Sequence, residues 1–402
     1  MVHIDETNLL ARLNDDFKEA VIEKALKKWG RRAGDPEEVK RIIEGFHISY
    51  DAQVHTMMSA TWDKAFPFVL GKTVDVTTSE ADDKLKKLRG KKPVIFVPDH
   101  RSNFDAPVVN YFLNKKNLLP VNIAGANLRG DKADVLGKVN VFFYERRLEG
   151  LPRIYPVLMN MYLEAVLDSK NNMLMFIEGG RSYTGVLNQK LVEADVNSRK
   201  GVGSLVKHLH SDDVHIAPLS INYVWVGEDQ ELMKFFKEGE AMPKVDLIEN
   251  CLQLQKRLAV YEDFKVYMRI GTPQPLSEYI QRSEKADVNR GTDALQLELV
   301  KSIAKERVHF SHQILSKAVL ESGRVGLDET VYAVATDLQE REFILRNDEF
   351  YDSEGNIEVG KVLKVGKKRL TSRGIITDDF DIRDRSLIQF YANQCMYNEN
   401  NS

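Results

Sequence analysis

The sequence has little of what marks secreted, nucleic-acid-binding or membrane-spanning proteins. Its 402 residues include two cysteines, Cys251 and Cys395, which stand far apart and outside any metal-ligand spacing, so we expect reduced thiols. A net charge of -3 with 29% charged residues gives no sign of a nucleic-acid binder. No stretch approaches the roughly 20 apolar residues of a membrane-spanning helix, and the N-terminus lacks the pattern of a secretion signal. We therefore expect a cytoplasmic protein, soluble or attached peripherally to the inner face of the membrane.

The sequence does contain a regular alternation of strand-like and helix-like segments. Strands are predicted near 93–97, 120–124, 139–144, 173–177, 215–223 and 265–270, and helices near 104–113, 131–136, 153–167 and 200–208. Such alternation is typical of an α/β domain whose sheet is mainly parallel and flanked by helices. After the last strand, residues 271–275 contain two prolines and are expected to leave regular structure.

Helical regions are predicted on both sides of this domain. An amphipathic helix over 8–29 ends in a basic tail at 27–32, which suits either an anionic membrane surface or packing on the main domain. A second helix begins near Asp35, and the chain looks helical to about Thr73. Beyond Ser283 long helices are expected, with a short strand pair near 369–376 and a last helix over 386–395. The predicted division is a helical region 1–75, an α/β domain 76–285 and a mostly helical region 286–402.

A histidine and an aspartate with four residues between them follow the first strand of the α/β domain. His100 would emerge at the carboxyl end of this strand, where ligands bind in open α/β sheets, and Asp105 would stand at the start of the next helix. A neutral histidine acting as a base needs one ring nitrogen tied down and the other able to take a proton. A carboxylate that accepts the Nδ1 hydrogen does this and stabilises the imidazolium.

Three further stretches point to the same edge of the sheet. Residues 176–185 follow a strand directly, and they combine paired glycines with Glu178, Arg181 and Ser182. Residues 141–147 form an apolar strand that ends in Arg146 and Arg147, whose burial would be costly without an anion. Pro218 stands inside a predicted strand, which suits an edge strand or a bulge.

Taken in order, these motifs resemble the glycerolipid acyltransferase family. The resemblance is closest to its glycerol-3-phosphate and dihydroxyacetone-phosphate acyltransferase branch, which is marked by His-Arg-Ser-x-x-Asp and Glu-Gly-Gly-Arg-Ser-x-Thr-Gly. Both stand here, at 100–105 and 178–185. The resemblance is good over 93–276 and loose over 300–395, and the paired motifs are far more specific than His-x4-Asp alone.

The resemblance implies a fold, a reaction and a set of site residues. The fold is the glycerol-3-phosphate acyltransferase-like α/β fold, and the reaction is O-acyl transfer without a covalent intermediate. His100 matches the general base and Asp105 the residue that orients it. The residues that match the acceptor-binding and supporting positions are Arg146, Arg147, Glu178, Gly179, Arg181 and Ser182 for the acceptor phosphate, and Arg101, Ser102 and Pro218 for support.

The implied substrates are an acyl donor and a phosphorylated acceptor. The donor is acyl-CoA or acyl-carrier protein, the acceptor is glycerol 3-phosphate at its sn-1 hydroxyl, and no cofactor or metal is needed. The branch usually has Phe-Phe-Ile-Arg-Arg, whereas this chain has one residue more, Glu145, so either Arg146 or Arg147 is the phosphate arginine. An acid at this place also occurs in lysophosphatidate acyltransferases, which are the first alternative. The second is a catalytically silent protein that binds lipid or acyl-carrier protein.

Two other groups of residues have plausible readings. The basic segments 27–32 and 84–92 suit an anionic membrane surface as well as a solvated face. His208, His210 and His215 lie close in sequence, but no cysteine or carboxylate set completes a zinc site around them, and we expect structural or surface roles.

Overall fold

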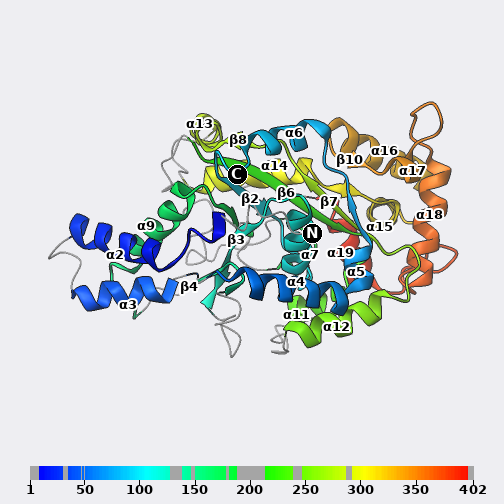
Figure 1. The fold of residues 1–402 in the computed structure, drawn as a ribbon. Coiled ribbons are helices and arrows are strands. Elements are labelled where there is room, and N and C mark those ends of the chain that lie inside the picture. Colours follow the sequence, from blue (N-terminus) through cyan, green and yellow to red (C-terminus); the bar gives the residue numbers. More distant parts are fainter. Residues whose placement is uncertain are drawn as a thin grey trace.

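The computed structural model describes residues 9–29, 35–46, 48, 50–126, 138–145, 150–177, 181–187, 213–238, 247–286 and 292–396. Its fold is of the α/β class that the sequence predicts, with a mixed, mostly parallel sheet flanked by helices (Figure 1). Two of the predicted helices, near 131–136 and 200–208, lie outside the described residues.

The large sheet has the strand order β1-β7-β6-β2-β5-β3-β4, with β8 beside β6. Its strands are β1 (Thr73–Asp75), β2 (Val94–Pro98), β3 (Pro120–Gly125), β4 (Val141–Tyr144), β5 (Asn172–Leu174), β6 (His215–Tyr223), β7 (Val266–Ile270) and β8 (Gln274–Pro275), while β9 (Val308–His309) and β10 (Ile344–Leu345) form a separate pair. The five strands β6, β2, β5, β3 and β4 run parallel to one another, whereas β7 and β8 run antiparallel to β6. The carboxyl ends of the five parallel strands therefore lie at one edge of the sheet, as the sequence predicts.

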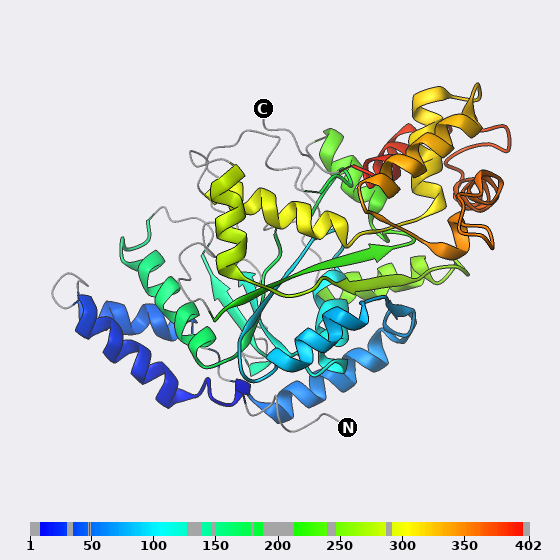
Figure 2. The ribbon, with the colours of Figure 1, turned by 90° about the horizontal axis from the view of Figure 1, so that it is seen from above.

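The described helices cover the sheet and extend beyond both of its ends. They are α2 (Asp15–Trp29), α3 (Pro36–Phe46), α4 (Ala52–Ala65), α5 (Pro67–Gly71), α6 (Ser79–Leu88), α7 (Asp105–Lys115), α9 (Tyr155–Asp168), α11 (Asp229–Glu238), α12 (Leu247–Leu258), α13 (Leu276–Ala286), α14 (Thr292–Lys305), α15 (Ser311–Ser322), α16 (Leu327–Glu340), α17 (Asn347–Phe350), α18 (Val359–Ser372) and α19 (Arg385–Asn393). Helices α2, α3 and α9 pack together near β4, and α15 to α19 gather at the opposite end (Figures 1 and 2). Helix α14 packs on β2 and β6.

The two central strands are buried along their whole length. All five residues of β2 and all nine of β6 are closed from solvent, as expected of parallel strands covered on both faces. The apolar side chains of these strands belong to a hydrophobic core that continues into the N-terminal and C-terminal helices. The carboxyl end of β2 is therefore held within the hydrophobic core.

The strand pair that we predict near 369–376 is wrong. Residues up to Ser372 belong to α18, whose buried positions Val362, Gly366 and Leu370 recur at helical spacing. Gly366 lets α18 approach α15 closely, because a Cβ there would lie 2.9 Å from the carbonyl oxygen of Ser311. After the helix, a single bridge joins Ile376 and Ile382. The helical spacing of α18 is the better guide to this segment.

Of the two positions that we expect to suit Pro218, an edge strand or a bulge, the edge strand is wrong, because β6 lies between β2 and β7. The amides of His215 and Ile221 donate toward β2, to the Pro93 carbonyl and to Asp99, so an amide at 218 would face the other side. On that side β8 pairs with 215–216 and β7 with 219–223, so that Pro218 stands at the gap between them. A central strand thus accepts a proline where its ladder is interrupted.

Smaller differences concern the ends of elements. The N-terminal helix begins at Asp15 rather than near 8, where the side chain of Asn14 accepts from the Phe17 amide at 3.1 Å. Helix α3 begins as predicted, with the Asp35 carboxylate accepting from the Glu37 amide at 3.0 Å. Four short strands of the described ranges were not predicted: β1 at Thr73–Asp75, β8 at Gln274–Pro275 within the expected irregular segment, and the pair β9 at Val308–His309 and β10 at Ile344–Leu345.

Candidate active site

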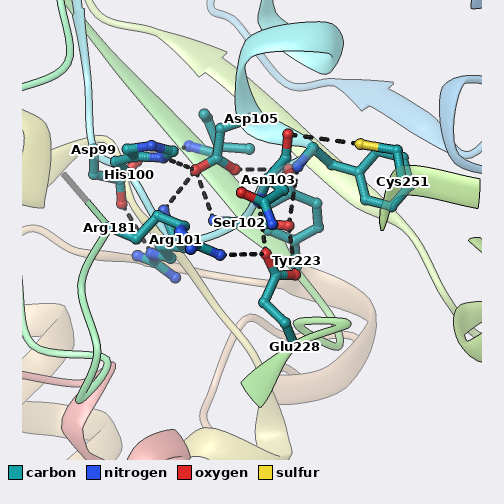
Figure 3. Close-up of polar contacts among 12 residues, drawn as sticks. Asp99, His100, Arg101, Ser102, Asn103, Asp105, Arg181, Tyr223, Glu228 and Cys251 are labelled. Carbon is teal, nitrogen blue, oxygen red and sulfur yellow. Dashed lines mark hydrogen bonds and ion pairs between the residues drawn. The ribbon is translucent and has the colours of Figure 1, made fainter. Parts of the chain in front are cut away.

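The predicted histidine and aspartate meet in the turn that joins β2 to α7. β2 ends at Pro98 and α7 begins at Asp105, so six residues, Asp99 to Phe104, form the turn. The Nδ1 atom of His100 lies 2.6 Å from Oδ2 of Asp105 (Figure 3). The side chain of His100 is 22% exposed, whereas that of Asp105 is fully buried. Since a carboxylate only accepts, Nδ1 carries the hydrogen and the ring takes up a proton at Nε2.

Asp105 is held by three further donors. The backbone amides of Arg101 and Ser102 donate to the same Oδ2, at 2.5 and 2.8 Å, and the hydroxyl of Tyr223 donates to Oδ1 at 2.8 Å. Burial and the neighbouring Asp105 charge raise the pKa of Tyr223 well above its ordinary value, so the phenol remains a donor. Two amides, a phenol and the imidazole together fix the position of the Asp105 carboxylate.

A second buried acid, Glu228, lies on the other side of the turn, just before α11. Its carboxylate accepts from the Ser102 hydroxyl at 2.8 Å and from the Asn103 amide at 2.6 Å, and its Oε1 lies 3.3 Å from Nη1 of Arg181 (Figure 3). Burial raises the pKa of Glu228 to about 7, against the lowering effect of its donors. Arg181, predicted to bind the acceptor phosphate, thus lies against the turn that carries His100.

The segment 181–187 packs directly on the histidine turn. The Ser182 amide donates to the His100 carbonyl at 2.7 Å, and the ring of Phe176 lies 4.4 Å from the imidazole, centre to centre. Ser182 is buried, and its hydroxyl donates to the Val186 carbonyl at 2.8 Å. The hydroxyl that we expected to serve the phosphate therefore also closes its own turn.

Arg101 is buried, and its side chain extends toward the C-terminal helices. Its Nε donates to Asp99 at 2.9 Å and its Nη1 to Gln394 at 3.2 Å. Asp99, fully buried, also accepts from Arg307 at 3.2 Å. Two arginines and one aspartate therefore tie the histidine turn to the region beyond residue 292.

The same C-terminal region fastens the segment 181–187. The Asn393 side chain donates to the Thr184 carbonyl at 2.9 Å. Gly185 has a φ of +85°, and a Cβ there would lie 2.4 Å from the carbonyl oxygen of Phe390 in α19. Glycine is therefore required at this position both for backbone conformation and for space.

Of the eleven predicted site residues, seven are described. His100, Arg101, Ser102, Asp105, Arg181 and Ser182 come together at the carboxyl ends of the parallel strands, while Pro218 lies beside Val97 inside β6. Arg146, Arg147, Glu178 and Gly179 lie outside the described residues, although β4 ends just before the two arginines and at the same edge. Sequence analysis did not single out Tyr223 or Glu228. Tyr223 had one signal, its place at the end of the strand that pairs with β2.

Metal-binding clusters and membrane-spanning helices are both absent from the described ranges. Among these residues, no three or more His, Cys, Asp or Glu side chains are grouped as a metal site requires. Within the same ranges, no helix has the length and apolar character needed to traverse a bilayer.

Known proteins similar to this chain include the following. A model of the family described as Acyltransferase matches residues 77–222. The glycerol-3-phosphate acyltransferase of Glaesserella parasuis serovar 5 (strain SH0165) is 25% identical over 283 residues, which are 68% of this chain and 32% of that protein. This chain thus spans about a third of the length of that relative. The structure of the 1-acyl-sn-glycerophosphate (LPA) acyltransferase PlsC from Thermotoga maritima matches with a TM-score of 0.32 and 16% identity, covering 60% of this chain and 79% of that chain.

Proposed function

We propose that the chain is an acyltransferase of the family whose model matches residues 77–222, and that it transfers a fatty acyl group from acyl-CoA or acyl-carrier protein to glycerol 3-phosphate. The proposed acceptor atom is the sn-1 hydroxyl, and the reaction is the first step of phospholipid synthesis. The contact of 2.6 Å between His100 and the buried Asp105 carries the proposal, because it prepares an imidazole to act as a base.

In the proposed reaction His100 transfers one proton, and Asp105 stabilises the protonated imidazole. Nε2 of His100 takes the proton of the acceptor hydroxyl while the hydroxyl oxygen attacks the carbonyl carbon of the thioester. The buried carboxylate of Asp105 balances the charge of the imidazolium that forms. The tetrahedral intermediate then breaks its carbon–sulfur bond, and the departing thiolate takes the proton from the imidazolium. The products are an ester and a free thiol, and no acyl-enzyme forms.

The proposed phosphate anchor is Arg181, together with Arg146 or Arg147. A guanidinium offers a planar fork of donors that suits a phosphate. The position of Arg181 supports this role. Glu228 links Arg181 to the histidine turn, and the Arg181 side chain is 17% exposed and so accessible to a substrate. The relative from Glaesserella parasuis, a glycerol-3-phosphate acyltransferase, supports glycerol 3-phosphate as the acceptor.

The proposal is tested by following thiol release from acyl-CoA with purified protein and glycerol 3-phosphate. We expect His100→Ala to reduce turnover by at least about 10³-fold, as removal of a general base does at triad-like sites. His215→Ala is a matched control. It removes a buried histidine at the N-terminal end of β6, away from the strand ends that carry His100, and should keep turnover close to that of the parent. Unchanged turnover in His100→Ala would contradict the proposal.

Two alternatives have distinct outcomes in the same assay. Faster turnover with lysophosphatidate than with glycerol 3-phosphate would assign the protein to lysophosphatidate acylation. Binding of acyl-CoA or acyl-carrier protein without thiol release with either acceptor would indicate a silent binding protein.

We also propose peripheral attachment to an anionic membrane through the basic segments 27–32 and 84–92. Residues 84–92 lead into the N-terminal end of β2, opposite to His100, and Lys92 lies 3.0 Å from Asp213. The proposal therefore concerns attachment rather than delivery of a substrate. Flotation with anionic vesicles at low salt should recover the protein, and absence of binding under these conditions would contradict it.

A further inference from the structure

Glu228 is an acid in a place where an acid is costly. The residue is 3% exposed, and transfer of a carboxylate from water into such surroundings is unfavourable unless charged or polar partners compensate. Its partners come from two separate segments, Ser102 and Asn103 in the histidine turn and Arg181 after the fifth strand. A residue that merely filled space here would not need a charge.

The two carboxylate oxygens of Glu228 contact different partners. Among the described residues, Oε2 accepts from the Ser102 hydroxyl, whereas Oε1 accepts from the Asn103 amide at 2.6 Å and also lies 3.3 Å from the guanidinium of Arg181. One oxygen atom is therefore shared between the backbone that carries His100 and the arginine. Glu228 thus links the guanidinium to the turn that carries the imidazole through a single atom.

We propose that Glu228 is a positioning residue that fixes Arg181 relative to the His100 turn, so that one acceptor molecule meets both groups at once. This inference rests on the proposed function, since it takes Arg181 as a phosphate contact and His100 as the base. Catalytic rates depend steeply on such spacing, because a displacement of about 1 Å can cost about 100-fold. Glu228 itself does not contact the substrate in this arrangement.

Glu228→Gln is the informative substitution because it changes charge and little else. The amide oxygen of glutamine can still accept from the Asn103 amide, and its NH₂ group can donate to the Ser102 hydroxyl. The contact with Arg181 loses its ionic character. We expect the KM for glycerol 3-phosphate to rise about 10- to 100-fold, the range for a hydrogen bond to a charged group, while the KM for acyl-CoA stays the same.

A double-mutant cycle with Arg181→Ala shows whether Glu228 acts through the arginine. If it does, the double variant has the same acceptor KM as Arg181→Ala alone. Glu349→Gln is the matched control, because Glu349 is also buried and bonded to Arg369 and the Ser311 amide, but lies among the C-terminal helices. This control should lower stability without raising the acceptor KM. If Glu228→Gln does not fold, Glu228→Asp, which keeps the charge one methylene shorter, enters the same cycle.

The outcomes separate this inference from the proposed function. Turnover in the parent protein together with independent, multiplying effects of Glu228→Gln and Arg181→Ala would overturn the inference and leave the function standing. An unchanged acceptor KM in Glu228→Gln would do the same. Absence of turnover in the parent protein with every phosphorylated acceptor would overturn both.

Discussion

Replacing Asp105 by asparagine separates the charge of this residue from its shape. With its amide oxygen in the place of Oδ2, asparagine still accepts from His100 and from the amides of Arg101 and Ser102. Its NH₂ group then faces the Tyr223 hydroxyl, which can accept a hydrogen bond. The turn and the imidazole tautomer are therefore retained, and the negative charge is lost.

The magnitude follows from the separation of the two charges. Nδ1 and Oδ2 lie 2.6 Å apart, which places the centres of the imidazolium and carboxylate charges further apart than that. At an effective dielectric constant of about 20, unit charges about 4 Å apart attract by roughly 4 kcal/mol, or about 10³-fold in rate. We expect kcat of Asp105→Asn to fall by about this factor, with the KM for the acceptor much less affected.

The assay is thiol release at saturating concentrations of both substrates. His100→Ala and the double variant belong to the same series, because without the imidazole the charge has nothing to stabilise, and the double variant should be no slower than His100→Ala. Tyr223→Phe removes one neutral donor from the same carboxylate and should cost about tenfold or less. The reasoning is refuted if Asp105→Asn, folded as judged by thermal unfolding, matches Tyr223→Phe in kcat, or if its effect persists in full without His100.

Two further predictions concern stability. Folding raises the pKa of Glu228 from 4.5 to about 7. The contribution of its protonated form to the free energy of unfolding is therefore complete below pH 4.5 and is lost as pH rises through about 7. Arg181, Asp105 and Tyr223 are the ionisable groups that face it. Relative to Glu228→Gln, the parent should lose up to ~3 kcal/mol of unfolding free energy between pH 4.5 and 7, measured by urea denaturation, and a constant difference would contradict this. Gly185→Ala should cost at least about 3 kcal/mol by the same method, because strain at its positive φ is joined by a clash with a carbonyl oxygen. Gly150→Ala has a similar φ of +78° but open space, so it should cost only about 1 kcal/mol, and equal costs would contradict the clash.

The fold was predictable where burial leaves a strong pattern in the sequence. β2 is a continuous apolar run and β6 is mostly apolar because both faces of these strands are covered, and their predicted bounds are nearly those observed. β1 and β8 have three and two residues, too few for any period to be recognised. The edge strand expected for Pro218 was wrong, because sequence alone does not reveal that the hydrogen-bond ladder of a central strand is interrupted at this residue.

The site was predictable where its members are close in sequence. His100 and Asp105 are five residues apart, and the turn between a strand and a helix brings them together. Tyr223 is 118 residues from Asp105, and Glu228 is 126 residues from Ser102. Their contacts depend on the pairing of β6 with β2 and on the path of the chain after β6, which no local pattern encodes.

The fastening of Thr184 by Asn393 has a consequence for a chain that is still being synthesised. The two residues are 209 positions apart. At about 5 to 20 residues per second, a ribosome needs roughly 10 to 40 s to proceed from the first to the second. During this interval the nascent chain already contains His100, Asp105 and Arg181 but not the helix that fastens the segment beside them. The histidine turn of a growing polypeptide is thus synthesised well before helix α19, which holds the segment 181–187.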